Sequence, residues 1–299
     1  MRGRRLPRLA VALAALALPL LLAACAGDGE EGAATATVTT GATPAPPSQI
    51  GTAEQPPATT TTTETSVLVY LIRDEKVGVA RRTVPRTRAV GAAALRELLE
   101  GPTPAERDAG LGTLIPEGTR LLGLEVRAGT ATVDLSGEFV TGGGSLSMLG
   151  RVAQVVYTLT QFPSVRRVRF AVDGEPVEAI GGEGVAVEPP VDRADFEELA
   201  PAILVESPAP WDTVTSPIRL RGTANTFEAT FRAEVRDASG RTVGEATVTA
   251  TAGSGTRGTF DARIRYAAPQ PGEGTLRVFE LSAEDGRPIN VVELPIRLE

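Results

Sequence analysis

Few side chains in this sequence could do covalent or acid–base chemistry. Its 299 residues contain one cysteine, Cys25, and no histidine. Without histidine there is no Ser-His-Asp triad, no imidazole base and no zinc site with histidine ligands. Catalysis would have to rely on Asp, Glu, Arg, Tyr, Ser or Thr, and a mechanism with two carboxylates is compatible with this composition.

Asp134 and Glu138, on either side of Ser136, are the carboxylates considered for such a mechanism, because they follow a predicted strand. One interpretation is a pair acting on a glycan, which requires carboxyl groups about 5 to 9 Å apart and one raised pKa. The other is an exposed strand end with a cap for the residues that follow. The second is favoured, so we predict no catalytic residue, no cofactor and no metal site.

Cys25 stands directly after an apolar run that ends in Leu22-Ala23-Ala24. The run covers residues 9–24 and follows four arginines. A basic start, an apolar run and small residues at its end are typical of a secretion signal. The run has about 16 residues, fewer than the roughly 20 that a membrane-spanning helix needs. We therefore expect residues 1–24 to be a signal peptide.

The sequence Leu-Ala-Ala-Cys resembles the lipobox of bacterial lipoproteins. This resemblance implies cleavage before Cys25 and attachment of a diacylglyceryl group to its sulfur, with acyl chains such as palmitate. Two acyl chains are enough for stable anchoring. The expected location is thus the cell membrane, at its extracytoplasmic face.

The charge of the chain limits its partners. Loss of the four arginines before Cys25 would leave 26 basic and 37 acidic residues, a net charge of −11. An acidic surface argues against binding to nucleic acid and against electrostatic attraction to anionic lipid. The acyl anchor would be the contact with the membrane, and the remaining partner would be an unidentified envelope protein or a second copy of the chain.

Residues 25–65 are dominated by Thr, Ala, Gly and Pro and include five consecutive threonines at positions 59–63. Bulky apolar residues are almost missing from this segment, so it cannot form a core. We predict a disordered tether, which as a random coil of about 40 residues would span about 35 Å.

Folding signals begin at Ser66. Apolar runs and helical periodicity predict an order of ββα, ββα and a further strand. Helices then cover one face of a mixed sheet in an α+β domain over residues 66–190. The expected strands are 67–72, 77–84, 121–126, 130–135 and 165–172. The expected helices are 88–100, a short one that starts with a capping box at Thr103–Glu106, and 145–162 with Ser145 as N-cap.

The second half of the chain has no helical periodicity. After an acidic inter-domain linker at 191–202, part of which could be a short helix, seven short segments favour strand within residues 203–299. Seven strands in about 100 residues predict an immunoglobulin-like sandwich.

Two places in these domains are candidate interaction sites. Trp211 lies in the first loop of the sandwich, where it is either a binding anchor or a plug for one end of the core. Arg167 and Arg169 share one face of a strand, with Val168 and Phe170 opposite. They would meet an acidic partner or a second copy, or form a solvated sheet face.

Short segments in both domains carry a family resemblance. In the first domain they are 69–71, 98–102, 115–119, 131–136, 155–160 and 172–174, and in the second 207–208, 216–218, 220–224 and 227–229. The first domain is similar to the GerMN domain of spore-germination lipoproteins, and the second resembles the Gmad type of immunoglobulin-like domain. This resemblance implies a non-enzymatic envelope protein with a label of sporulation or germination.

Three functions remain open from the sequence. The favoured one is a lipid-anchored scaffold or regulatory lipoprotein that acts by protein contacts. The alternatives are a carboxylate-only hydrolase or lyase of cell-wall glycan and a small-ligand sensor. A deep apolar pocket between the domains would favour the sensor.

Overall fold

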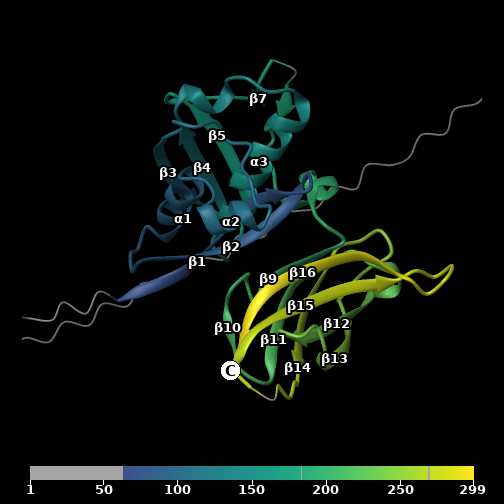
Figure 1. The fold of residues 1–299 in the computed structure, drawn as a ribbon. Coiled ribbons are helices and arrows are strands. Elements are labelled where there is room, and N and C mark those ends of the chain that lie inside the picture. Colours follow the sequence, from purple (N-terminus) through teal and green to yellow (C-terminus); the bar gives the residue numbers. More distant parts are fainter. Residues whose placement is uncertain (1–62, 183, 269) are drawn as a thin grey trace, which may run out of the picture. The chain divides into compact units, whose positions relative to one another are not determined.

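The computed structural model describes residues 63–182, 184–268 and 270–299 (Figure 1). The predicted signal peptide, Cys25 and nearly all of the predicted tether lie outside these residues. The described part forms an α+β domain followed by an all-β sandwich, so the predicted fold class is confirmed. Among the described residues, no helix combines the length and the apolar composition needed to cross a membrane.

The first domain opens with a long antiparallel hairpin of β1 (Glu64–Arg73) and β2 (Lys76–Pro85). Asp74 and Glu75 form its turn with positive φ values of 50° and 62°. The strand starts earlier than the sequence predicts, because Glu64 and Thr65 already pair with β2. The last residues assigned to the tether therefore belong to the folded domain.

Two short helices follow the hairpin. Helix α1 (Val90–Leu99) buries Ala94, Leu95 and Leu98 and ends just before Gly101. Helix α2 (Pro104–Asp108) starts with the predicted capping box, in which the Thr103 hydroxyl accepts from the Glu106 amide and the Glu106 carboxylate accepts from the Thr103 amide. This reciprocal pairing satisfies two backbone donors at the helix start.

Helix α3 (Ser145–Leu159) is the centre of the first domain. All but one of the residues from Met148 to Leu159 are buried, so the helix is enclosed on every side and contacts β1, α1 and β5. Its limits differ from the predicted ones. Gly144 takes the N-cap position, which makes Ser145 the first helical residue, and the helix ends three residues before Phe162.

Beside α3 lies a mixed four-stranded sheet of order β3-β4-β5-β6, in which β4 and β5 are parallel. The β1–β2 hairpin is not hydrogen-bonded to this sheet and forms a sheet of its own. The smaller elements are β7 and β8, which pair with each other, and the 3-10 turn η1. The bounds of these elements are β3 (Leu121–Arg127), β4 (Thr130–Leu135), η1 (Gly137–Val140), β5 (Arg167–Val172), β6 (Glu175–Pro176), β7 (Ala179–Ile180) and β8 (Val185–Ala186).

The segment expected as an inter-domain linker is folded. Asp192 caps the 3-10 turn η2 (Arg193–Leu199). Val191, Phe196 and Leu199 are buried in the core of the first domain. Much of the acidic segment therefore packs as part of the first domain.

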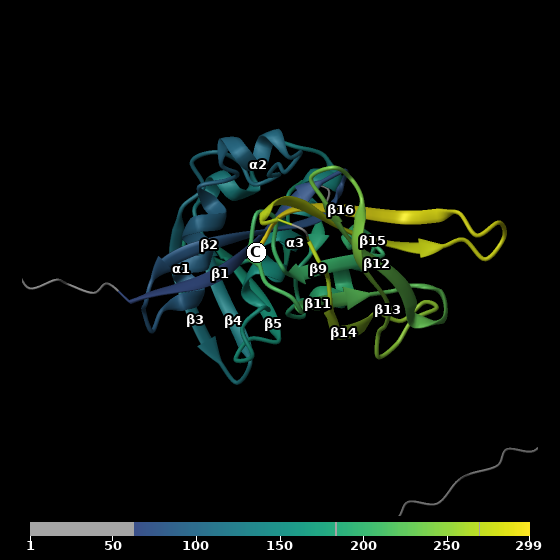
Figure 2. The ribbon, with the colours of Figure 1, turned by 60° about the horizontal axis from the view of Figure 1, so that its bottom comes forward.

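The second domain is a sandwich of two sheets, with strand orders β14-β11-β9 and β10-β16-β15-β12-β13 (Figure 2). All seven predicted strands are present, and the short strand β10 is added. The strand that the sequence predicts over residues 227–235 begins only at Thr230, because Phe227–Ala229 form the 3-10 turn η3. The strands are β9 (Ile203–Ser207), β10 (Thr213–Val214), β11 (Ile218–Ala224), β12 (Thr230–Asp237), β13 (Thr242–Thr249), β14 (Gly258–Ile264), β15 (Gly272–Leu281) and β16 (Pro288–Leu298).

Candidate interaction sites

A polar cluster of the buried Tyr70 with the half-buried Arg193 and Glu206 joins the two domains. The Tyr70 hydroxyl donates to a Glu206 carboxylate oxygen over 2.5 Å, and the Arg193 guanidinium donates to the same oxygen over 2.8 Å. Arg193 also donates to the Tyr70 hydroxyl and to the hydroxyl of Thr160. Its guanidinium carbon lies 5.1 Å from the centre of the Tyr70 ring and 4.8 Å from that of Tyr157.

The electrostatics of this cluster hold Tyr70 and Arg193 each in one protonation state. Burial raises the pKa of Tyr70, and Glu206 raises it further against the opposing charge of Arg193. Burial disfavours the charged form of Arg193, but Tyr70 and Glu206 outweigh it and the pKa of the guanidinium is raised. The phenol therefore stays protonated and the guanidinium stays charged, which suits a structural link.

Further side chains connect the same two parts of the chain. The Arg81 guanidinium on β2 pairs with Asp212 at 2.9 Å. Glu197 of η2 accepts from Arg257 at 2.8 Å and from the Asn225 side chain at 2.9 Å. Burial alone would raise the pKa of Glu197, but these two bonds lower it below its ordinary value. Leu204 of β9 adds an apolar contact, because it packs into the core of the first domain.

The sequence did not single out Tyr70, Arg193 or Glu206. Tyr70 lies inside a run that reads only as a buried strand, and Arg193 lies in a segment that reads as linker. Phenol and guanidinium groups in buried positions need partners, but the partners here are up to 136 residues apart in the chain. The only usable signal was the polar end of the tyrosine within an apolar strand.

The two predicted arginines do lie on one face of β5, with Val168 and Phe170 buried behind them. Both have carboxylate partners nearby: Arg167 is 3.6 Å from Asp192, and Arg169 is 3.1 Å from Glu188. The basic stripe is therefore largely neutralised by the segment that follows β8. Neither arginine contacts Trp211 in the part of the chain that the structure describes.

Trp211 is 43% exposed, so its indole does not fill the sandwich core. Its backbone has a φ of 65°, which a bulky residue rarely adopts, and its amide donates to the carbonyl of Pro295 over 2.6 Å. The residue thus holds the loop before β10 against β16 and leaves its side chain at the surface.

The carboxylates considered for glycan chemistry have structural contacts. Asp134 accepts from the Gly174 amide over 3.0 Å, and the buried Ser136 hydroxyl accepts from the Arg120 amide over 2.9 Å. A hydrogen bond from Ser136 lowers the pKa of Glu138, whereas a catalytic acid needs a raised pKa. These contacts match the interpretation as a strand end. No group of three or more acidic side chains that could hold a metal is found within the described residues.

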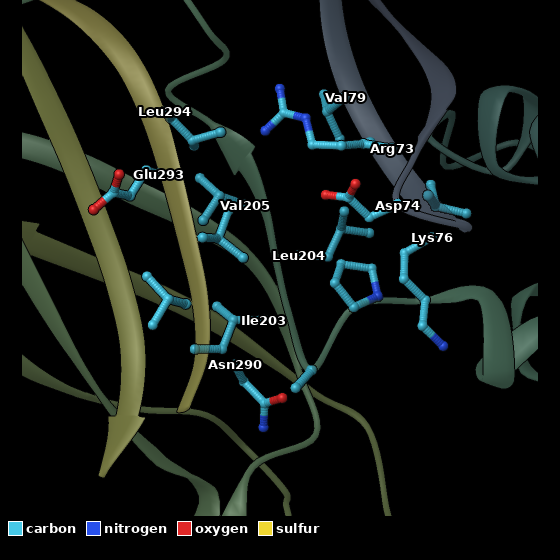
Figure 3. Close-up of a pocket in the computed structure, with 16 residues that line it drawn as sticks. Arg73, Asp74, Lys76, Val79, Ile203, Leu204, Val205, Asn290, Glu293 and Leu294 are labelled. Atoms are coloured by element: carbon cyan, nitrogen blue, oxygen red, sulfur yellow. The ribbon is translucent and has the colours of Figure 1, made fainter. Parts of the chain in front are cut away.

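Two hollows lie where the domains meet. The larger, of about 870 Å³, is polar and is lined by Arg81, Arg193 and Glu206, which already serve the inter-domain contacts. The smaller, of about 440 Å³, is lined by β2, β9 and β16 and has both apolar and charged side chains (Figure 3). Neither is the purely apolar pocket that a sensor for an apolar ligand would present.

Comparisons with known families decide what the two domains are. The family Germane, described as "Sporulation and spore germination", matches residues 68–178. The family Gmad2, described as an immunoglobulin-like domain of bacterial spore germination, matches residues 202–287. The chain carries a Germane domain followed by a Gmad2 domain. The Tyr70–Arg193–Glu206 cluster and the smaller hollow therefore lie between the Germane and Gmad2 domains.

Solved structures resemble parts of this Germane–Gmad2 chain. A protein from Clostridium perfringens described as a candidate lipoprotein has 20% identity, covers 46% of this chain and 92% of its own, and gives a TM-score of 0.34. The first GerMN domain of the sporulation protein GerM from Bacillus subtilis has 25% identity, with coverages of 44% and 98% and a TM-score of 0.36. The tandem GerMN domains of that protein have 17% identity, coverages of 69% and 63%, and a TM-score of 0.40. No curated protein matches the chain.

Proposed function

We propose that this protein is a lipid-anchored, extracytoplasmic lipoprotein of the cell envelope that acts by protein–protein contacts and not by catalysis. The descriptions of both matched families support an association with sporulation or spore germination. The lipobox at Cys25 supports the anchor, and the predicted tether at residues 25–65 would supply the reach.

The observation that carries the contact role is the cluster of Tyr70, Arg193 and Glu206, together with the Arg81–Asp212 and Glu197–Arg257 pairs. These contacts couple the Germane and Gmad2 domains, so the pair presents one composite surface to a partner. Arginine–carboxylate pairs with shared hydrogen bonds also fix how the two domains are oriented to each other, and a fixed orientation suits a scaffold or a regulator.

The anchor is tested by replacing Cys25 with Ser and comparing it with Ala26→Ser, which changes the next residue and keeps the lipobox. Cells are labelled with a clickable fatty acid and fractionated. We expect the parent and Ala26→Ser proteins to carry label and to pellet with membranes. Cys25→Ser should carry no label and leave the membrane fraction. A parent protein without label, or a Cys25→Ser protein that still pellets fully, would contradict the anchor.

The non-catalytic role is tested on the purified full chain with isolated peptidoglycan. We expect the same muropeptide profile with the protein, with its Asp134→Asn variant and with buffer alone. Fragments released by the parent protein but not by Asp134→Asn would overturn this part of the proposal.

The contact role is tested with photo-crosslinkers placed at Trp211 and Arg167 in intact cells. We expect discrete crosslinked species from the anchored protein. If the protein gives no crosslinked species from any exposed position, the contact role is contradicted.

A further inference from the structure

The hollow of about 440 Å³ between the domains is bordered by strands of three separate sheets, each unpaired along one edge where it lines the hollow. These are β2 of the hairpin, β9 of one sandwich sheet, and β16, whose outer neighbour β10 is only two residues long. Edge strands carry backbone N–H and C=O groups that can pair with another extended chain. A hollow with three such borders is the geometry in which an added strand finds partners.

The outer edge of β16 is free where it borders this hollow. Strand β10 pairs with β16 only at Arg297 and Leu298. The Pro295 carbonyl and the Arg297 amide face outward, because they bond to Trp211 and Asp212 and not to β15. Antiparallel strands alternate in this respect, so the backbone of Glu293 also faces outward. In the described part of the chain, no strand pairs with β16 on that side between Ile289 and Leu294.

Arg73, at the end of β1, lines the same hollow and lacks a partner. Its Nε is buried without a hydrogen bond, and it forms no ion pair with any described residue. Burial lowers the pKa of Arg73, while the charge of Asp74 raises it. Every other described arginine that is buried or half-buried has a bond or an ion pair, namely Arg81, Arg82, Arg151, Arg169, Arg193, Arg232, Arg236, Arg257 and Arg277.

The other residues that line the hollow restrict which kind of ligand could bind there. Val79, Leu204 and Leu294 come from the three bordering strands and form a buried apolar floor, and Val291 of β16 is an exposed apolar side chain of the lining. Of the other charged groups in the lining, Lys76 donates to the Glu198 carbonyl over 2.5 Å and Glu293 pairs with Arg277 at 3.3 Å. Arg73 and Asp74 project from the turn end of the hairpin toward β9 and β16 (Figure 3). The uncommitted cation is therefore Arg73, next to apolar surface and a free strand edge.

We propose that this groove binds an extended peptide segment of a partner protein, which adds a strand to the free edge of β16 and places an acidic side chain on Arg73. Such strand addition takes its affinity from main-chain hydrogen bonds and its specificity from pockets for alternate side chains. Apolar residues of the peptide contact the exposed Val291 of β16, and its carboxylate supplies the acceptor that Arg73 lacks.

A single extended chain fits this groove better than a second copy of the protein. Arg73 and Asp74 stand on the opposite wall from Glu293, so an occupant of the β16 edge lies between the β1–β2 turn and that strand (Figure 3). A whole sandwich edge from another copy would meet the β1–β2 turn first. The inference rests on the proposed contact role but not on the anchor.

The test uses the purified full chain with Cys25→Ser, which removes acylation, and a phage-displayed library of random octapeptides. Selected peptides are then synthesised with blocked ends and a fluorescent label, and their affinity is measured by anisotropy. We expect the selected peptides to share an Asp or Glu among alternating apolar residues. Failure to enrich any sequence would overturn the proposal.

Matched variants test each contact. Arg73→Gln should weaken binding by about tenfold or more, because a hydrogen bond to a charged group is lost. Asp74→Asn should strengthen it, because a like charge next to the peptide carboxylate is removed. Glu293→Pro deletes the outward amide, whereas Glu293→Ala deletes only the side chain. We expect weaker binding from the proline variant than from the alanine variant.

These variants should fold, since Arg73 has no intramolecular partner to lose and Pro295 already occupies an outward position on the same strand. Equal affinity in the parent, Arg73→Gln and Glu293→Pro proteins would overturn the groove as the binding site. Sedimentation equilibrium provides the other decisive outcome. If the parent protein is a dimer and Glu293→Pro makes it a monomer, the occupant of the groove is a second copy of the protein and not a partner peptide. If the selected peptides do not bind but crosslinks still form in cells, this groove is not the binding site. The proposed contact role is then unaffected.

Discussion

Strands β1 and β16 each have a long edge with little or no strand pairing, and the chain treats the two edges differently. On β1, the Gln161 side chain bonds to both the amide and the carbonyl of Leu68. Thr158 accepts from the Tyr70 amide, and Gln154 donates to the Tyr70 carbonyl. On β16, the outward backbone of Glu293 meets no such side chain among the described residues. One edge is closed by the fold, and the other remains available.

The closed edge shows how a helix can take the place of a strand. Gln154, Thr158 and Gln161 follow one another at intervals of four and three residues, so they lie on one face of α3 and its C-terminal end. Thr158 and Gln161, which bond to Tyr70 and Leu68, are three residues apart and so about 4.5 Å apart along the helix, against roughly 6.8 Å between alternate residues of a strand; the longer glutamine side chain covers the difference. The polar side chains of the helix therefore match the outward backbone groups of β1. Closing an edge in this way removes a site for unwanted pairing.

Proline substitutions should separate the two edges most strongly. Leu68→Pro removes an amide that bonds to Gln161 and should lower the free energy of unfolding by about 3 kcal/mol or more. Glu293→Pro removes an amide without a partner and should lower it by less than about 1 kcal/mol. Urea unfolding of the two variants, with Leu68→Ala and Glu293→Ala as controls for the side chains, measures the difference. Equal losses from both prolines would mean that the two edges are not different.

Gln154→Leu should have the next largest effect. The buried amide of Gln154 accepts from the Leu114 amide and donates to the Tyr70 carbonyl, so leucine leaves two backbone groups unpaired. Each buried unpaired group costs about 1 to 3 kcal/mol. We expect a loss of about 3 kcal/mol, against about 1 kcal/mol for Thr158→Val, which removes one acceptor at 3.2 Å. If both variants unfold at the parent urea concentration, these side chains do not close the edge.

The side chains of α3 show which parts of the fold the sequence could predict and which it could not. Apolar periodicity located α3 and the strands, because the helical and strand periods differ. It could not locate the polar stripe of α3, since glutamine and threonine on a helix normally indicate an exposed face. Burial of Gln154 and Thr158 depends on a strand some 84 to 88 residues away. Local spacing carries no information at that range.

The candidate sites were harder to predict than the fold. Arg167 and Arg169 were identified by alternation, but their carboxylate partners lie 19 to 25 residues further on, in a segment without periodicity. Arg73 attracts no attention in sequence, because a basic residue beside Asp74 at a turn normally faces water. Its importance depends on the approach of β9 and β16, which is a tertiary property. The predicted role of Cys25 stays a prediction, because that residue lies outside the described part.

Glu206→Gln tests the contacts between the domains and should have a moderate effect. Arg193 would lose its carboxylate partner but would keep its bonds to Tyr70 and Thr160, so we expect a loss of about 1 to 2 kcal/mol. The matched control is Glu188→Gln at the more exposed pair with Arg169, which should cost about 0 to 0.5 kcal/mol. Thermal unfolding of both variants at one salt concentration makes the comparison. A larger loss from Glu188→Gln would contradict the importance of the inter-domain cluster.

Lowering the pH should weaken the ion pairs of Glu106 and Glu197 before it weakens the closed edge of β1. The resulting loss of stability is the smallest effect that we expect. Burial opposes the charged form of Glu106, but the bonds from Arg82 and Thr103 outweigh it and lower the pKa below its ordinary value of 4.5. A carboxyl group with a lowered pKa in the folded state stabilises the protein above the unfolded pKa, and this stabilisation is lost as the pH falls toward the folded pKa. Glu197 behaves in the same way.

The β1 edge has no such dependence, because Gln154, Thr158 and Gln161 are neutral at every pH in this range. Between pH 5 and pH 3.5 the free energy of unfolding should therefore fall, by up to about 1.4 kcal/mol for each unit of pKa depression. Glu106→Gln should flatten this slope, because it removes the carboxyl group whose pKa is lowered in the folded state. Hydrogen exchange under native conditions should still show protected amides at Leu68 and Tyr70. Early exchange of these two amides, before global unfolding, would show that the β1 edge depends on charge after all.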